Sequence, residues 1–558
     1  MTINLKIYIA QLNPTVGAVA SNCDLISSAY EQASQAGADL IVTPELSVVG
    51  YPIEDLVLKP SLVTAARDAL DRLSALTKAE NAPGLLVGVP YLDRGKLHNA
   101  TVLLDQGKIQ QVRYKYDLPN YGVFDEVRVF EQGPLPAPIE FRGCRLGVMI
   151  CEDMWFEASA KSLYQQNADI LIVPTCSPFE ADKHPERMVH ATARVAETKL
   201  PLVFCNQIGG QDELVFEGAS FVLNKDGTCP VQMKAWQEEG ALVEFQQGAC
   251  ITRLHEAVPS ELEAIYQAMV LGVKDYVNKN RFPGVLIGLS GGVDSALTAA
   301  VAVDALGADR VRCVMMPSRY TSGESLTDAE QCAEALKVSY ENIAIAEGVA
   351  AFDKMLEDAF SNTTPDTTEE NIQSRLRGLI LMSLSNKFGY MVLTTGNKSE
   401  MSVGYATLYG DMCGGYNPLK DVYKTTAFDL CHWRNTHFPT GALGPDSEVI
   451  PVNIIVKPPT AELRDDQKDE DSLPPYERLD AILRALVDEE KSVKDLLDQG
   501  FDKEELARIE HLLYIAEYKR RQAPPGVKIT RKNYGRDRRY PITNGYRSAH
   551  LLKENKVG

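Results

Sequence analysis

The segment 285–306, VLIGLSGGVDSALTAAVAVDAL, constrains the fold of this chain most, because an apolar strand, a glycine turn and an alanine-rich helix follow one another in it. Two further apolar strand candidates come later, VRCVMM at 311–316 and YMVLTT at 390–395. Strands that alternate with helices are typical of a doubly wound parallel sheet. We therefore predict an α/β fold of this kind for residues 285–558.

A six-residue loop inside this segment can hold an anion. It consists of Ser290, Gly291, Gly292, Val293, Asp294 and Ser295. Consecutive glycines let backbone N–H groups turn inward, serine hydroxyls add donors, and the start of the following helix contributes partial positive charge. No Gly-Lys-Ser/Thr ending is present, which disfavours kinase-like transfer of a terminal phosphate. The loop predicts binding of a phosphate or pyrophosphate, with Asp294 beside a metal ion; a glycine turn without a ligand is the alternative.

The N-terminal half alternates short apolar runs with amphipathic ones from Lys6 to about Ile251. The strand candidates are KIYIAQLNP, DLIVTPEL, GLLVGVP, CRLGVMICED, ADILIVPT and PLVFCNQIGG, and helices are expected near 24–36 and 184–198. This mixture predicts an α/β or α+β sandwich. A helical stretch then leads into the second half, so we expect domains at 1–255 and 285–558 with a connector at 256–284. The acidic segment 458–475 is predicted to be a loop.

Composition restricts the compartment and the partners. The formal net charge of −19 over 558 residues disfavours general binding to nucleic acid. No apolar run is long enough to cross a bilayer and no signal-peptide pattern begins the chain, so we expect a cytoplasmic protein without a membrane partner. The eleven cysteines are an odd number, and reduced thiols are expected. A basic tail from Lys519 to Arg547 is either solvated or binds an anion.

Three reactive residues accompany apolar runs of the first half. They are Glu45 in LIVTPEL, Lys115 in VRYKYDLP and Cys151 in LGVMICEDMW. A carboxylate can take the proton of a thiol, and a lysine ammonium together with the N–H of Glu152 can then stabilise the oxyanion of an attacked amide. Each residue alone is also compatible with a buried thiol or a surface charge. Together they are compatible with a cysteine amidase.

These three residues resemble the Glu-Lys-Cys triad of the nitrilase superfamily, in its glutamine amidotransferase branch. The resemblance covers most of residues 5–250 and includes the strings ELSVVGYP, KYDLPNYGVFDE and CSPFEADK. It implies an α/β/β/α sandwich. It also implies that Tyr121, Ser177 and Lys183 bind glutamine and that Glu126 assists the acid–base steps.

The string SGGVDS resembles the pyrophosphate loop of the N-type ATP pyrophosphatases, which share the adenine nucleotide α-hydrolase-like fold. Further strings resemble NAD synthetases: TTGNKSE at 394–400, GGYNPLKDVYKT at 414–425, EENIQSRLRG at 369–378 and EYKRRQAPPGVKIT at 517–530. This resemblance implies that ATP and Mg²⁺ are required. The residues it assigns are Thr395 to ATP, Lys424 to phosphate, Asn371, Glu400 and Lys519 to deamido-NAD, and Asp294 with Glu400 to the metal.

As a whole, the chain resembles the glutamine-dependent NAD synthetases. The resemblance implies that deamido-NAD is adenylated by ATP and then amidated by ammonia from glutamine, and that the chain forms a homo-oligomer built on a synthetase-domain dimer. An alternative enzyme with the same halves acts on another carboxylate or on a tRNA base. A regulatory protein that binds nucleotides without turnover is a third hypothesis.

Overall fold

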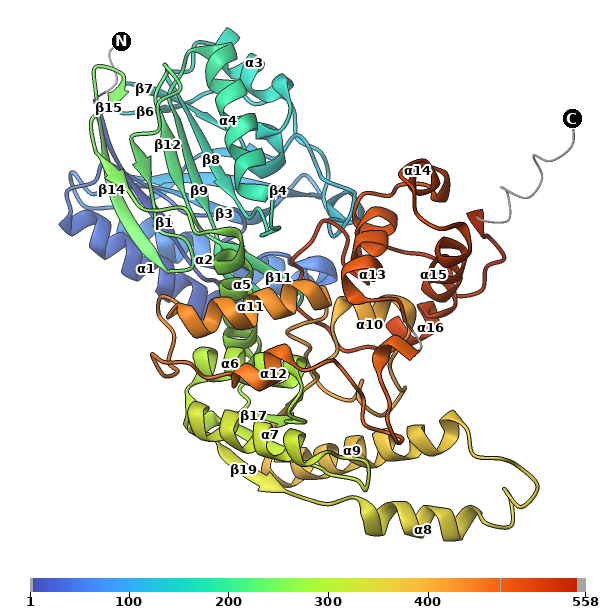
Figure 1. Cartoon of the computed structure of the whole chain (residues 1–558). Coiled ribbons are helices and arrows are strands. Elements are labelled where there is room, and N and C mark those ends of the chain that lie inside the picture. Colours follow the sequence, from blue (N-terminus) through green and yellow to red (C-terminus); the bar gives the residue numbers. More distant parts are fainter. Residues whose placement is uncertain (1–3, 472, 549–558) are drawn as a thin grey trace, which may run out of the picture. The chain divides into compact units, whose positions relative to one another are not determined.

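The computed structural model describes residues 4–471 and 473–548, and the chain divides into two compact units, Met1–Ser260 and Glu261–Gly558 (Figure 1). In the described residues no helix is long and apolar enough to span a membrane. All eleven cysteines are free thiols, as expected from the sequence.

The first unit contains two seven-stranded sheets and a small two-stranded one. One large sheet has the order β15 (Ala249–Cys250), β14 (Glu239–Gln246), β1 (Leu5–Gln11), β2 (Leu40–Val42), β3 (Gly84–Asp93), β4 (Lys96–Asp105) and β5 (Lys108–Tyr114). The other has the order β16 (Leu254–His255), β13 (Val231–Gln232), β12 (Phe221–Leu223), β9 (Leu202–Asn206), β8 (Ile170–Thr175), β7 (Cys144–Val148) and β6 (Ile139–Phe141). Strands β10 (Ile208–Gln211) and β11 (Leu214–Glu217) form the two-stranded sheet.

Alternating side chains explain how these sheets form layers. In β1, Ile7 and Ile9 belong to a core cluster shared with the other large sheet, whereas Tyr8 packs in a second cluster with residues of α1 (Val19–Gln35) and α2 (Pro60–Leu76). In β8, Ile172 faces the shared core and Val173 packs with α3 (Glu157–Gln165) and α4 (Lys183–Thr198). Successive residues of a strand point to opposite faces of the sheet, so each large sheet is buried on both of its faces. The predicted α/β/β/α sandwich is confirmed.

The second unit is built on a four-stranded parallel sheet of order β19 (Ser339–Asn342), β18 (Val311–Met315), β17 (Val285–Gly288) and β20 (Met391–Leu393). Helices cover both of its faces, because α6 (Val293–Leu306) contacts β17 and β18 while α9 (Thr367–Phe388) contacts β17 and β20. The chain leaves β17 toward β18 and returns to the other side of β17 as β20. A ligand crevice forms at such a reversal of strand order. The predicted doubly wound sheet is confirmed.

The second unit contains further helices. They are α5 (Glu261–Lys279), α7 (Gly323–Leu336), α8 (Ala346–Leu356), α10 (Lys398–Val403), α11 (Lys424–Thr436), α12 (Val452–Val456), α13 (Tyr476–Leu483), α14 (Val493–Asp498), α15 (Lys503–Ile515) and α16 (Glu517–Arg520). Short helical turns are η1 (Glu54–Leu58), η2 (Glu126–Arg128), η3 (Cys151–Met154), η4 (Ala308–Arg310), η5 (Asp469–Asp471) and η6 (Arg484–Asp488). Apart from η5, the described part of the acidic segment 458–475 lacks helix and strand, as predicted.

Candidate active sites

The first site lies where strands of both large sheets end. Glu45 follows β2, Lys115 follows β5, and Cys151 opens η3 after β7. Their exposed fractions are 0% for Glu45, 1% for Lys115 and 5% for Cys151. Charged side chains this deeply buried require partners.

Lys115 has two carboxylate partners. Its Nζ lies 2.6 Å from Glu45 Oε1 and 2.8 Å from Glu126 Oε1. Asn99 Nδ2 donates to Glu45 Oε1 at 2.7 Å and to Glu126 Oε2 at 3.3 Å, and the Tyr51 hydroxyl donates to Glu126 Oε1 at 2.9 Å. The structure thus gathers Glu45, Lys115 and Glu126 into one hydrogen-bonded group.

The electrostatics of this group favour a charged lysine. Burial by itself lowers the pKa of the Lys115 ammonium, but Glu126 and Glu45 raise it well above its usual value. Burial and the Glu45 charge raise the pKa of Glu126, against the effect of Lys115. Two carboxylates therefore share one ammonium, and the group as a whole can take up a proton.

Cys151 occupies a strained turn beside this group. Its φ of +48° lies in the left-handed region, where a residue with a Cβ is uncommon. Burial and the Glu45 charge raise the pKa of the Cys151 thiol, while Lys115 lowers it. A thiol in this position is protonated at rest and needs a base before it can attack.

The residues predicted to bind glutamine lie near Glu152, the residue after the nucleophile. The Tyr121 hydroxyl donates to Glu152 Oε1 at 3.0 Å, and Lys183 Nζ lies 4.3 Å from the centre of the Trp155 ring. Burial raises the pKa of the Glu152 carboxyl, and Lys115, Tyr121 and Lys183 lower it. The structure therefore places the Tyr121 hydroxyl and the Lys183 ammonium near the carboxylate of Glu152.

Ser177, the third predicted ligand, is held by other side chains. Its Oγ accepts a hydrogen bond from Arg187 Nε at 2.9 Å, and its N–H donates to Asn206 Oδ1 at 3.0 Å. Arg187 is 1% exposed and forms an ion pair with Glu217. Ser177 is thus rigidly placed, with its hydroxyl hydrogen available to a ligand.

The second site begins with the loop 290–295 after β17. Gly291 has a φ of +77°, and a Cβ at this position would come within 2.3 Å of the carbonyl oxygen of Ser325. Only glycine fits there without movement of the backbone. The Ser290 N–H donates to Ser295 Oγ at 3.2 Å, which closes the turn at the start of α6. The local sequence therefore forms a tight glycine turn at the start of α6, which the predicted anion site requires.

Lys424, at the start of α11, faces the acids of this site. It forms an ion pair with Asp294, and its Nζ lies 3.5 Å from Glu400 Oε1. Asn397 caps α10 and donates to Asp294 Oδ1 at 3.1 Å. Burial raises the pKa of Glu400 to about 8; Lys424 lowers it, and Asp294 and Asp469 add to the rise. The structure brings Asp294, Glu400 and Lys424 together.

The other predicted residues of this half lie around them. Thr395 follows β20 and is half-buried. Asn371 Oδ1 accepts a hydrogen bond from Thr407 Oγ1 at 2.7 Å, and Lys519 Nζ donates to the carbonyls of Gly404 at 2.8 Å and Ala406 at 2.7 Å. Asn371 and Lys519 thus hold the same turn, 404–407, which directly follows the helix of Glu400.

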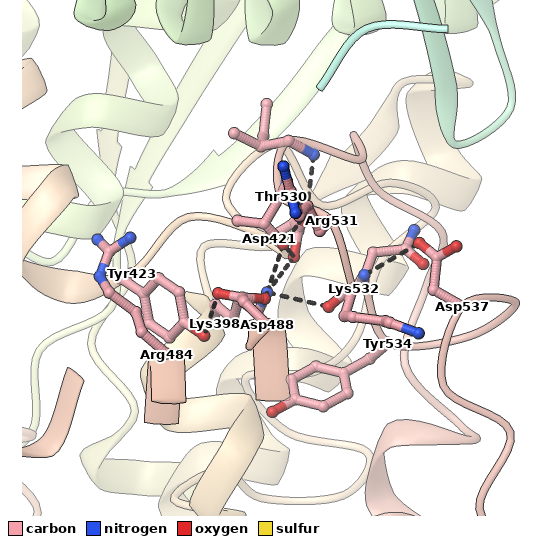
Figure 2. Close-up of polar contacts among 12 residues, drawn as sticks. Lys398, Asp421, Tyr423, Arg484, Asp488, Thr530, Arg531, Lys532, Tyr534 and Asp537 are labelled. Atoms are coloured by element: carbon pink, nitrogen blue, oxygen red, sulfur yellow. Dashed lines mark hydrogen bonds and ion pairs between the residues drawn. The ribbon is translucent and has the colours of Figure 1, made fainter. Parts of the chain in front are cut away.

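A buried charge cluster fixes that helix to the C-terminal part of the chain (Figure 2). Lys398 Nζ lies 2.8 Å from both Asp421 Oδ1 and Asp488 Oδ1, and it donates to Thr530 Oγ1 at 2.6 Å. Asp421 Oδ2 accepts the Thr530 N–H at 2.6 Å. Since Lys398 and Glu400 belong to the same short helix, this cluster positions the acid of the second site.

Cations of the basic tail have partners within the unit. Glu517 pairs with Arg520 at 2.9 Å, Arg521 at 3.0 Å and Arg538 at 2.9 Å. Lys528 pairs with Asp537 at 2.8 Å. These four cations neutralise nearby carboxylates, so the basic charge of the tail is partly structural.

Several residues of both sites escape sequence reasoning. Asn99 lies inside β4, where it is indistinguishable from a solvated strand residue. Asp469 comes from the acidic segment; its carboxylate accepts the Tyr476 hydroxyl at 2.9 Å, and it lies close enough to Lys424 for their charges to interact. Its signal in the sequence was an acid run bounded by prolines, which is also typical of a solvated loop.

Comparisons with known proteins identify the family of each half. Residues 6–252 match the carbon-nitrogen hydrolase family, and residues 265–523 match the NAD synthase family. The chain is 49% identical over 552 residues to the glutamine-dependent NAD(+) synthetase of Rhodobacter capsulatus, covering 98% of this chain and 100% of that protein. It is 38% identical to the enzyme of the same name from Thermotoga maritima, covering 97% and 99%.

A solved structure of an enzyme with the same name is also similar to this chain. The glutamine-dependent NAD+ synthetase from Acinetobacter baumannii, in complex with ADP, has a TM-score of 0.78 and 41% identity, covering 98% of this chain and 100% of that one. A family model matches each half, and the relatives match over their full length. The chain therefore belongs to the family of glutamine-dependent NAD(+) synthetases.

Proposed function

We propose that this chain amidates deamido-NAD to NAD with ATP, using ammonia that its first unit releases from glutamine. Family membership supports the overall reaction. The observation that carries the proposal is the buried group of Glu45, Lys115 and Glu126 beside the Cys151 thiol, because it supplies a base and a cation to a nucleophile.

In the first unit, Glu45 accepts the proton of the Cys151 thiol as the sulfur attacks the amide carbon of glutamine. The Lys115 ammonium and the N–H of Glu152 stabilise the oxyanion. The proton then passes to the leaving nitrogen, the C–N bond breaks, and ammonia departs from a thioester. Water, deprotonated by the same carboxylate, hydrolyses the thioester to glutamate and restores the thiol. Glu126 assists these proton transfers through Lys115.

Glutamine itself carries an α-ammonium and an α-carboxylate, and the unit offers a complement to each. Glu152 and the Tyr121 hydroxyl suit the ammonium, while Lys183 and the Ser177 hydroxyl suit the carboxylate. These opposite charges would select a free amino acid over a simple amide.

In the second unit, a carboxylate oxygen of deamido-NAD attacks the α-phosphorus of ATP, and the bond to pyrophosphate breaks. The loop 290–295 holds the pyrophosphate with backbone N–H groups, Lys424 binds phosphate oxygens, and Thr395 contacts ATP. Ammonia then attacks the adenylated carbonyl, a proton is released, and AMP leaves. Asn371, Glu400 and Lys519 bind deamido-NAD around the turn 404–407.

The acids of this site fit Mg²⁺. This ion takes one or two carboxylates and completes its shell with phosphate and water. Asp294 and Glu400 both face Lys424, and burial together with the Asp294 charge raises the pKa of Glu400, a cost that a bound cation relieves. The ion would neutralise phosphate charge. Asp294 and Glu400 would hold it.

A Cys151→Ala variant tests the division of labour. Glutamine-dependent synthesis of NAD should be lost, because the nucleophile is gone, and synthesis from ammonium chloride should stay within about twofold of the parent. AMP and NAD are measured with deamido-NAD, ATP and magnesium. Equal loss of both activities would contradict the proposal. AMP release with tRNA but not with deamido-NAD would favour the alternative substrate.

We also propose a homo-oligomer that includes a dimer of the second unit. Helix α9 spans 22 residues, and the buried ones are Gln373, Ser374 and Gly378. Leu379 is 58% exposed and Met382 36% exposed, one turn apart on the same face. An exposed apolar helix face of this kind supports pairing with a second copy. Eleven free thiols support a reducing, cytoplasmic location.

A further inference from the structure

The nucleophile turn contains a second acid, Asp153, whose partners are backbone N–H groups. Asp153 is 1% exposed and accepts three backbone hydrogen bonds. Its Oδ1 accepts the N–H of Tyr116 at 3.0 Å and of Asp117 at 2.8 Å, and its Oδ2 accepts the N–H of Ile150 at 2.9 Å.

These three N–H groups flank the reacting residues. Tyr116 and Asp117 directly follow Lys115, at the end of β5 in one large sheet. Ile150 directly precedes Cys151, after β7 in the other large sheet. One side chain thus joins the backbone that carries the ammonium to the backbone that carries the thiol.

An asparagine would break this arrangement. Each carboxylate oxygen of Asp153 accepts from a different segment, whereas an asparagine amide would direct an N–H donor at one of them. The turn also needs support, because Cys151 has a φ of +48° and such strain persists only when the surroundings hold it. The neighbouring Glu152 has a different partner, the Tyr121 hydroxyl.

We propose that Asp153 is a positioning residue for glutamine hydrolysis, which fixes Lys115 and Cys151 relative to each other through their neighbouring backbone. This inference rests on the proposed glutaminase function.

The test compares Asp153→Asn with Asp226→Asn in the full-length chain. Asp226 makes the same kind of backbone bond, to Thr228 at 3.0 Å, but on an exposed turn. For Asp153→Asn we expect kcat for glutamine hydrolysis to fall about 30–100-fold, because misplacement by about 1 Å costs on that order. KM for glutamine and ammonia-dependent synthesis should stay within about twofold. Alkylation of Cys151 by iodoacetamide should slow. Asp226→Asn should behave like the parent.

Hydrogen exchange of the unmodified protein provides a second measurement that does not depend on folding of the variant. Tyr116 and Asp117 lie outside the strands, so their amides owe protection to Asp153 and should exchange as slowly as those of β5. Exchange at the rate of an open loop, or wild-type kcat in Asp153→Asn, would overturn the inference. So would a parallel loss of ammonia-dependent synthesis. If Cys151→Ala retained glutamine use, the glutaminase assignment itself would fail instead.

Discussion

At the scale of single residues, the glutamine site depends on an unequal number of buried charges. Lys115 contacts two carboxylates, so one negative charge stays unmatched within the group. That excess gives Glu45 the capacity to accept the proton of Cys151 without separating a new ion pair. The same excess makes the group sensitive to the loss of either acid.

Replacement of Glu126 by glutamine tests this charge balance. The amide keeps the size of the side chain but removes the excess charge, so we expect kcat for glutamine hydrolysis to fall about 100-fold, within the range of acid–base groups. KM should change little. Glu140→Gln, on the exposed edge strand β6, is the matched control. Unchanged kcat in Glu126→Gln would contradict the role of the second carboxylate.

The pH dependence of stability tests the burial of Asp153. Burial raises the pKa of this carboxyl to about 7. Between about pH 4 and 7 the unfolded chain ionises at this residue and the folded chain does not, so wild type loses stability relative to Asp153→Asn as pH rises, by at most about 1.4 kcal/mol per unit. Thermal unfolding midpoints of both chains at pH 5, 6 and 7 measure this. Parallel curves would mean that Asp153 titrates normally.

At the scale of elements, the second site is set by where strands end. β17 and β20 are adjacent and parallel, so the loop 290–295 and the turn before α10 must meet at one edge of the sheet. This meeting was predictable from the two strings SGGVDS and TTGNKSE. The contact of Asp469 with Tyr476 was not, because no periodicity links a loop residue to the helix that follows it.

Gly291→Ala tests the shape of the loop. The new Cβ would meet the Ser325 carbonyl, so backbone must move and ATP-dependent AMP release should fall at least about 100-fold. Gly307→Ala is the control: its φ of +82° also favours glycine, so a Cβ there costs about 1–3 kcal/mol of backbone strain, but open space surrounds that Cβ. It should lower the melting temperature and leave synthesis intact. Similar activities for the two variants would show that strain alone matters.

At the scale of the whole molecule, the fold class was predictable because each half has a strong local signal. Alternating apolar runs in the first half and the strand–turn–helix string in the second imposed the two architectures. The partners of buried charges were harder to predict from the sequence, because Asn99 and Asp153 act through long-range contacts that depend on the packed sheets. The basic tail shows this limit, because a count of charges cannot distinguish a cation that binds a ligand from a cation that pairs with Glu517.

Association through α9 is tested by Leu379→Asp. The dimer would bury this face, so a charge there should raise the dissociation constant of the dimer at least about 30-fold, as the loss of a central interface contact does. Light scattering after size-exclusion chromatography measures the mass. Leu92→Asp, at a position 56% exposed in the first unit, is the control and should leave the mass unchanged. An unchanged mass for Leu379→Asp would place the interface elsewhere.

The hydrogen bond between Lys398 and Thr530 has a consequence for the nascent chain on the ribosome. A ribosome finishes the first compact unit once residue 260 is made, whereas the ammonium of Lys398 meets the Thr530 hydroxyl only after the tail emerges. At typical rates of translation, roughly 15 to 50 seconds separate these events. During that interval the unit that hydrolyses glutamine is complete, whereas the synthetase unit still lacks the contact between Lys398 and Thr530.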